Sequence, residues 1–293
     1  MNPPSGGAVY GRAPGPLGVN AQPGPPSPGP AIPLQQPSVK EFQEPVPTDD
    51  DRKRGIGMQS FSTSPIFDGQ APDFKNVRQG AVFNCPLPAI LAAMVHTKVF
   101  DKKIKITEHA VQIRSKHYDG KTASGNRYFS VQFPNQTQDV SDFFFTDGGR
   151  LNYGRSKENE LWVALVEKAY VAWKAPSTGY QALNAQQGSS FHKGVDVVQA
   201  MNDLLGASSA TVIAMNDSTL TAVLGKAGQQ PVLAAAKETA DSNVVIPWHA
   251  YTVLKFTANT KQVEVFDALT GNQKTITLKQ LQDNFQGIIT ATP

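Results

Sequence analysis

The sequence predicts an α+β domain preceded by a disordered tail, and three observations support this prediction. The 293 residues are 40% hydrophobic and 17% charged, a balance that suits a folded domain able to bury a sizeable core. Apolar residues recur at helical spacing in the part of the chain between residues 86 and 205. From Thr211 onwards, short alternating runs are separated by turn residues, which is typical of antiparallel strands rather than of βαβ units.

The N-terminal segment is dominated by proline and glycine over residues 1–48. Such a segment buries too little apolar surface to offset the entropy of ordering it, so we expect residues 1–60 to form a disordered tail and linker. The charged run Asp49–Arg54 is interpreted as part of this solvated linker, with a processing site or docking motif as the alternative. The folded domain is predicted to begin between Phe61 and Phe74 and to cover residues 61–293.

Composition also limits the partners and the compartment of the protein. A net charge of +3 is too small to indicate a nucleic acid or an anionic membrane as a partner. No run approaches the roughly 18 apolar residues that span a bilayer, and the first residues lack the basic start and apolar core of a secretory signal. We therefore expect a cytoplasmic protein, or one exported without a conventional signal peptide, as a secreted effector is.

Cys85 is the single cysteine of the chain, which excludes an intrachain disulfide and argues against a zinc or iron–sulfur site. It precedes a predicted helix over Pro86–His96 that is apolar on nearly every face, as a central buried helix is. Pro86 and Pro88 fall in the first turn, where their missing N–H groups need no partner. At this N-cap the positive end of the helix dipole favours a thiolate. This stretch alone is compatible with a reactive thiol or with an inert buried one.

Hydrophobic periodicity and turn residues predict the remaining helices and strands. Two further helices are predicted over Glu158–Trp173 and Val195–Leu205, and Gly206 is a suitable C-cap for the second. The apolar face of the first of these is interpreted as core packing. The predicted strands and a short helix complete the chain: strands over Ala210–Met215, Pro231–Ala235, His249–Thr257, Gln262–Phe266, Ile276–Leu278 and Ile288–Thr292, and a helix over Lys279–Asn284.

A thiol nucleophile needs a histidine as acid and base, and that histidine needs an orienting acceptor. His249 is the candidate among the five histidines, because it opens a predicted strand directly after Trp248. The next predicted strand is followed by Asp267, and a hairpin between the two strands brings Asp267 back toward His249; the alternative is a plain turn residue. The other four histidines are interpreted as a helix-end residue (His96), two surface residues (His109 and His117) and a loop residue (His192).

Four stretches of the chain carry a resemblance to a known family. Gln79–Cys85 is similar to a Gln-Gly-x-x-Gly-Asp-Cys motif, with the same spacing from glutamine to cysteine. Asn159–Tyr170 is similar to Glu-Phe-Trp-x-x-Leu-Leu-Glu-Lys-Ala-Tyr, and Gly179–Leu183 to its continuation, Gly-x-Tyr-x-x-Leu. His249–Val253 is similar to His-Ala-Tyr-Ser-Val. In this order, over roughly residues 70–273, these motifs resemble the calpain family of cysteine peptidases.

The resemblance implies a papain-like fold, with a helical half that carries the nucleophile and an antiparallel β half that carries the histidine. It implies that Cys85 is the nucleophile and that Gln79 supplies the oxyanion-hole side chain. It likewise implies that His249 is the general acid and base and that Asp267 takes the position of the family's asparagine. The residues placed along the substrate cleft are Gly80, Gly194, Trp248 and Leu269.

The chain departs from the family pattern in the cleft. Pro86 replaces the tryptophan after the nucleophile, and Trp248 replaces the glycine before the histidine. Leu269 replaces the tryptophan that shields the contact between histidine and asparagine. The substrate preference of the family is therefore not carried over. Neither its acidic calcium loops nor an EF-hand pattern is found, so no cofactor is expected and a calcium requirement stays open.

The leading hypothesis is a calpain-like cysteine endopeptidase that acts on protein or peptide substrates. Its triad is Cys85, His249 and Asp267, with Gln79 in the oxyanion hole. One alternative is a catalytically weak or inactive calpain-like binding protein, which the altered cleft residues motivate. Another is an acyl transferase or amidase that uses the same triad. The sequence does not indicate an oligomeric state.

Overall fold

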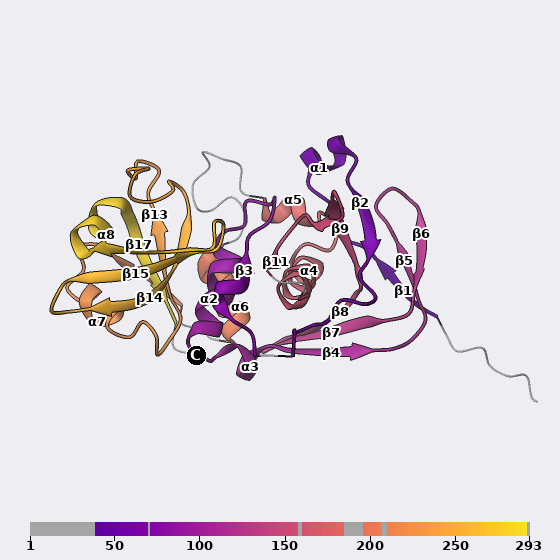
Figure 1. Ribbon diagram of the computed structural model, residues 1–293, viewed down its shortest axis with the longest axis horizontal. Coiled ribbons are helices and arrows are strands. Elements are labelled where there is room, and N and C mark those ends of the chain that lie inside the picture. The colour runs from indigo at the N-terminus through magenta and orange to yellow at the C-terminus, as the bar shows by residue number, and fades with distance from the viewer. Residues whose placement is uncertain (1–38, 70, 158–159, 185–195, 207–209, 292–293) are drawn as a thin grey trace, which may run out of the picture. The chain divides into compact units, whose positions relative to one another are not determined.

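A computed structural model describes residues 39–69, 71–157, 160–184, 196–206 and 210–291 of the chain. These residues contain eight α-helices, one 3-10 helix and seventeen strands (Figure 1). The disordered tail expected over residues 1–38 lies outside them. In the described part of the chain, no helix is both long enough and apolar enough to cross a bilayer.

The largest sheet has six strands in the order β12-β17-β13-β14-β15-β16, and all neighbouring strands are antiparallel. Side chains on these strands alternate between two apolar cores. Leu233, Ala235 and Phe266 face one core, whereas Ala234 and Val265 face the other. The strands are β12 (Thr211–Ala214), β13 (Val232–Ala236), β14 (Ala250–Thr257), β15 (Gln262–Asp267), β16 (Asn272–Thr277) and β17 (Phe285–Thr290).

The remaining strands form small sheets, in the orders β1-β5-β6, β10-β9-β2, β4-β7-β8 and β11-β3. β1 and β5 are parallel. Figure 1 shows several of these strands around α4. The strands are β1 (Lys40–Gln43), β2 (Gly57–Ser60), β3 (Val77–Arg78), β4 (Lys105–His109), β5 (Ile113–Lys116), β6 (Thr122–Gly125), β7 (Tyr128–Phe133), β8 (Gln136–Ser141), β9 (Phe143–Asp147), β10 (Arg150–Leu151) and β11 (Arg155–Ser156).

The helices range from a single turn to 13 residues. They are α1 (Asp49–Arg54), α2 (Pro86–His96), α3 (Phe100–Lys103), α4 (Trp162–Lys174), α5 (Tyr180–Leu183), α6 (Val197–Leu205), α7 (Leu220–Leu224) and α8 (Leu278–Asn284), with the 3-10 helix η1 over Phe74–Asn76. α7 and α8 cover one face of the six-stranded sheet. α2 packs against the other face through β13 and β14, and it also contacts α4 and α6 (Figure 1).

α2 is the central helix, and it has the bounds that the sequence predicts. Nine of its 11 residues are buried, which explains why it is apolar on nearly every face. Two side chains fasten it to β14. Thr252 Oγ1 donates to the carbonyl of Ala89 at 2.7 Å, and His96 Nε2 lies 2.9 Å from the carbonyl oxygen of Leu254. Because the predicted nucleophile precedes α2 and the predicted histidine precedes β14, these bonds fix the distance between the two.

Other predicted elements are confirmed with small shifts. β14 and β15 pair as the predicted antiparallel hairpin. Gly206 ends α6 in the left-handed conformation with φ +66°, as expected of a glycine C-cap. α4 begins at Trp162, later than the predicted start at Glu158, which lies outside the described residues.

The described elements begin before the predicted start of the folded domain. β1 pairs with β5 and β2 pairs with β9, so residues 40–60 belong to the fold. The charged run Asp49–Arg54 is helix α1 rather than a solvated linker, and the Thr48 hydroxyl caps it by accepting from the N–H of Asp51. Asp51 is buried, and its carboxylate accepts from the hydroxyls of Thr48 and Tyr153. Tyr153 is distant in the sequence, so local composition does not reveal this contact.

The half of the chain predicted as helical contains more strand than expected. Residues 105–147 form β4 to β9, in the region interpreted as polar surface around His109 and His117. Both histidines are half-buried. The ring of His109 stacks on Tyr128 at 4.4 Å between centroids, and His117 packs against Phe143. The fold is therefore mixed α and β on both sides of α2.

Candidate active site

Cys85 lies at the N-cap of α2 and is half-buried. Its Sγ atom is 4.0 Å from the carbonyl oxygen of Trp248, the residue before His249. In the described part of the chain, the N–H of Cys85 has no protein acceptor. This N–H therefore remains a donor for an oxygen atom placed beside the thiol.

His249 and Asp267 meet where the hairpin of β14 and β15 brings them together. His249 lies directly before β14, and Asp267 is the last residue of β15. His249 Nε2 is 2.7 Å from Asp267 Oδ1, and the two residues are 5% and 7% exposed. A buried bond of this length holds the imidazole in one orientation and leaves Nδ1 as its other polar atom.

The protonated form of this imidazole is stabilised. Burial disfavours that form, but hydrogen bonds and charge interactions with Asp267 and Cys85 outweigh burial and raise the pKa of His249 to about 9. Burial also opposes ionisation of Asp267, yet the bonds to His249 and to the following turn hold the pKa of this carboxyl below its ordinary value. The site therefore favours an imidazolium between the carboxylate and the thiol.

The turn after Asp267 fixes the carboxylate. Leu269 N donates to Oδ1 at 2.8 Å, and Thr270 Oγ1 donates to Oδ2 at 2.7 Å. Gly271 closes the turn with φ +76°, and a Cβ atom there would lie 2.1 Å from Cζ of Arg78. Both carboxylate oxygens are thus occupied, and the turn is packed against the guanidinium of Arg78.

Gln79 and Gly80 lie beside the same turn. Gln79 N donates to the carbonyl of Ala268 at 2.9 Å, which joins the segment before the nucleophile to the turn. The side-chain Nε2 of Gln79 donates to the carbonyl of Val82 at 2.9 Å, whereas its Oε1 is buried without a partner in the described residues. A Cβ atom on Gly80 would lie 2.2 Å from the backbone of Tyr153, so this close approach requires glycine.

A buried pair behind the nucleophile was missed in the sequence. Asn84 is fully buried, and its Nδ2 donates to Glu167 Oε2 at 2.7 Å. The other oxygen of Glu167 accepts from Gly154 N at 2.8 Å, and burial raises the pKa of this carboxyl. Asn84 and Glu167 both lie within the family-like motifs, which was the only signal for them in the sequence.

Trp248 and Leu269 are two of the three described residues at which the cleft departs from the family pattern; the third, Pro86, is buried in the first turn of α2. Trp248 is half-buried with φ +56°, in the left-handed region that costs a residue with a side chain about 1–2 kcal/mol. This is the position at which the resemblance expects glycine. The side chain of Leu269 is 43% exposed beside the triad. The predicted cleft residue Gly194, and His192 near it, lie outside the described residues.

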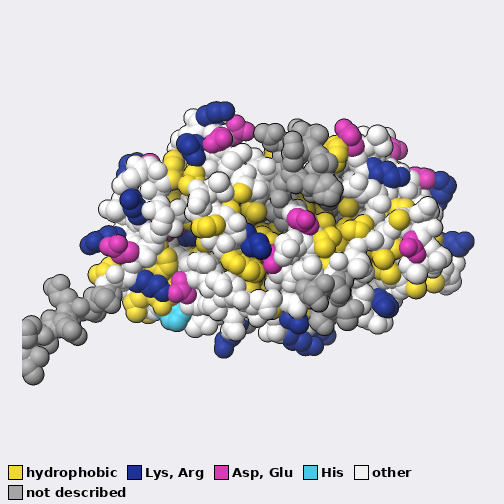
Figure 2. Space-filling model, turned by 180° about the vertical axis from the view of Figure 1, so that it is seen from behind, with side chains coloured by type: hydrophobic (Ala, Val, Ile, Leu, Met, Phe, Trp, Pro, Cys, Tyr) yellow, Lys and Arg dark blue, Asp and Glu magenta, His cyan; other side chains and the backbone are white. Residues whose placement is uncertain are grey.

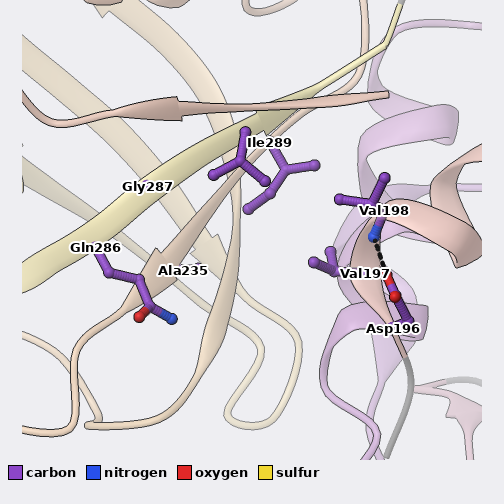
Figure 3. A pocket seen from close by; sticks show the side chains of 8 residues that line it. Asp196, Val197, Val198, Ala235, Gln286, Gly287 and Ile289 are labelled. Atoms are coloured by element: carbon purple, nitrogen blue, oxygen red, sulfur yellow. Dashed lines mark hydrogen bonds between the residues drawn. The ribbon is translucent and has the colours of Figure 1, made fainter. Parts of the chain in front are cut away.

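An apolar hollow of about 310 Å³ lies between α6 and the six-stranded sheet. Figure 3 shows Val197 and Val198 of α6 on one side and Ile289 of β17 on the other. The hollow also includes Ala235 of β13, which pairs with the first residue of β14. Because β14 separates β13 from β15, the hollow and the turn after Asp267 lie on opposite sides of the histidine.

The described residues contain no group of three or more His, Cys, Asp or Glu side chains arranged to hold a metal ion. On the face drawn in Figure 2, Lys and Arg side chains are interspersed with Asp and Glu. The described residues on that face therefore form no extended surface of a single charge.

Comparison with known proteins agrees with this geometry. The sequence profile of the family described as calpain family cysteine protease matches residues 51–283, a stretch that includes Cys85, His249 and Asp267. A comparison with curated proteins finds no match. Since the profile covers most of the chain, the protein belongs to the calpain family of cysteine proteases.

Proposed function

We propose that the protein is a cysteine endopeptidase with a papain-type arrangement of its two halves, and that it hydrolyses protein substrates. One observation carries this proposal: the buried ring of His249 is held by Asp267, and His249 directly follows Trp248, whose carbonyl oxygen lies 4.0 Å from Sγ of Cys85. An inert buried cysteine does not need a histidine fixed in this way. A nucleophilic thiol does, because its proton must be taken up and returned.

The order of proton transfers follows from which ring nitrogen is engaged. Asp267 binds Nε2, so Nδ1 is the nitrogen left to hold the proton taken from Cys85 Sγ, and this transfer leaves the imidazolium beside a thiolate. The thiolate adds to the carbonyl carbon of the substrate peptide bond. The C–N bond then breaks as the imidazolium gives its proton to the leaving amine. Water, deprotonated by His249, hydrolyses the resulting thioester and restores the thiol.

Two donors would stabilise the oxyanion of this reaction. One is the N–H of Cys85, which has no protein acceptor in the described residues. The other is the second hydrogen of Gln79 Nε2, since the first is donated to Val82. Removing one such donor costs about 10²–10³ in rate.

The apolar hollow beside His249 supports a peptide as the substrate. It is large enough for one aliphatic side chain, and its lining is mostly aliphatic. An extended peptide that places its carbonyl over Cys85 would direct a side chain toward this hollow.

Casein hydrolysis by purified protein tests the proposal. Cys85→Ala is expected to abolish cleavage, and Gln79→Ala to lower kcat about 10²–10³-fold. Gln59→Ala, at an exposed position on β2, is the matched control for loss of an amide and should retain full activity. Cleavage at the wild-type rate by Cys85→Ala would rule the proposal out.

An inactive binding protein is the second candidate, because Trp248 places a strained, bulky residue directly before the histidine. Under that reading, wild-type protein leaves casein intact, whereas Trp248→Gly gains activity when the widened cleft admits substrate. Incorporation of an added amine into casein, instead of hydrolysis, would identify an acyl transferase that uses the same triad.

We further propose that the catalytic domain begins near Val39, and that residues 1–38 serve in recruitment or targeting. We also propose that the protein is cytoplasmic or is exported without a conventional signal peptide. Casein cleavage assayed with added calcium and with a chelator shows whether the activity requires calcium.

A further inference from the structure

A basic pocket of about 500 Å³ lies next to the triad. Leu269 and Thr270, which fix the carboxylate of Asp267, form part of its wall. Four cationic side chains line the rest of it: Arg78, Arg150, Arg155 and Lys157. This pocket differs from the apolar hollow in both its lining and its place in the fold.

The four cations of this pocket form no ion pair with a carboxylate of the described residues, although Arg78 interacts electrostatically with Asp267 and Arg155 with Glu167. In the described part of the chain, none has a carboxylate oxygen within 4.0 Å. Asp147 is paired in register with Arg150, but its ion pair is formed with Arg54. The pocket is therefore a concentration of positive charge in a protein whose net charge is only +3.

Two of the cations oppose each other directly. Arg78 and Arg155 are register partners in the short pair of strands β3 and β11. Both are half-buried, and burial together with the charge of Arg155 lowers the pKa of Arg78. Like charges directly across a strand pair destabilise it, and a bound anion would offset this repulsion.

The position of the pocket indicates which end of the substrate it would contact. His249 must give its proton to the leaving amine, so the C-terminal part of the substrate extends from the thiol past the imidazole. Asp267 bonds to the imidazole, and Leu269 and Thr270 of the turn that follows it line the pocket, so the pocket is connected to the imidazole through this turn. The apolar hollow lies on the other side of β14.

We propose that this pocket binds the carboxylate of an aspartate or glutamate located on the C-terminal side of the scissile bond. The substrate class is thus a protein or peptide with an acidic residue after the cleavage site. This inference rests on the proposed peptidase function for its direction along the substrate. Arginine fits the role, because its planar guanidinium pairs with a carboxylate through two parallel hydrogen bonds.

Quenched fluorogenic peptides test the inference in wild-type protein. Each carries an aliphatic residue before the cleavage site and either glutamate or glutamine at one of the first three positions after it. We expect kcat/KM to be about tenfold higher for a glutamate peptide, the size of one partly exposed charge-assisted hydrogen bond. Arg155→Gln should remove this preference while changing cleavage of the glutamine peptide less than about twofold.

Two controls keep the result specific. Arg150→Gln/Lys157→Gln alters only exposed pocket cations, so it should lower the preference even if Arg155→Gln disturbs the fold. Arg114→Gln, an exposed arginine on β5, should leave it unchanged. Wild-type protein that cleaves both peptides equally, or a preference that survives both pocket variants, would overturn the inference.

Peptide binding to Cys85→Ala protein separates this inference from the proposed function. If wild-type protein cleaves no peptide, the peptidase proposal fails. Fluorescence anisotropy then still decides whether the glutamate peptide binds more tightly than its glutamine counterpart. Loss of that difference in Arg155→Gln supports an acidic-peptide pocket, and equal binding of the two peptides by Cys85→Ala rejects it.

Discussion

The two sides of the candidate active site are held in place by different interactions. Behind Cys85, the helix α4 supplies buried charged and polar groups: Glu167 bonds to Asn84, and Lys168 forms an ion pair with Glu44 at 2.6 Å. Beside His249, the six-stranded sheet is apolar on both faces over most of its length. Its one buried ion pair among the described residues is that of His249 with Asp267.

This difference determines how much stability each side of the site loses when one contact is removed. Buried charges must keep their partners, because an unpaired charge in an apolar interior costs several kcal/mol. The nucleophile side therefore depends on single contacts. An apolar sheet distributes its stability over many contacts, so the histidine side should lose less stability than the nucleophile side when one polar partner is removed.

The largest expected effect is on catalysis rather than on stability, and it concerns the histidine side. His249→Ala should lower kcat/KM for casein about 10⁴-fold, because both proton transfers lose their carrier. His109→Ala is the matched control, as this histidine is half-buried on β4 outside the site. Equal activity of the two variants would contradict the assignment of His249.

The second-largest expected effect is a loss of folding stability on the nucleophile side. Lys168→Met should lower the free energy of unfolding by about 3–5 kcal/mol, because it leaves Glu44 buried without its cation. Lys279→Met removes the exposed pair with Asp283 and should cost at most about 1 kcal/mol. Urea unfolding of both variants at pH 7 measures the difference, and equal losses would show that the buried pair has no special importance.

The pH dependence of stability tests the histidine pair. Since the pKa of folded His249 is about 9, above its ordinary value of 6.5, its protonation stabilises the folded state. This contribution is complete below pH 6.5 and is lost as the pH rises through 9, by up to about 3 kcal/mol. His249→Gln should lack this decline. A wild-type stability that rises between pH 6.5 and 9 relative to His249→Gln would contradict the pairing.

The smallest expected effect concerns the start of the domain. Deleting residues 1–38 should change the melting temperature and casein cleavage little, because the described elements begin at Lys40. Deleting residues 1–60 also removes β1, α1 and β2, together with the buried Glu44 and Asp51, and should prevent folding. Soluble, active protein from the longer deletion would instead support the domain start at residue 61 that composition predicts.

The sequence predicts the histidine side well because its signals are local. Alternating strands, a short loop and a capped helix specify the hairpin and α8 without distant contacts. The bounds of α2 are equally local, since prolines mark its start and apolar residues continue to its end.

The features that the sequence does not predict depend on contacts between residues that are distant in the sequence. Arg78 and Arg155 become neighbours only through two-residue strands, which are too short to give a pattern. The charged helix α1 is stabilised by Tyr153, on another segment. β7 is a different case, since Phe129, Val131 and Phe133 alternate there and the period was available in the sequence.

The most direct test of the central claim, that His249 activates Cys85, is the rate of covalent labelling by an epoxysuccinate inhibitor at pH 6. Mass spectrometry should find one label per wild-type chain, on Cys85, and labelling of His249→Ala should be at least about 100-fold slower. Equal labelling rates in the two proteins would contradict the claim.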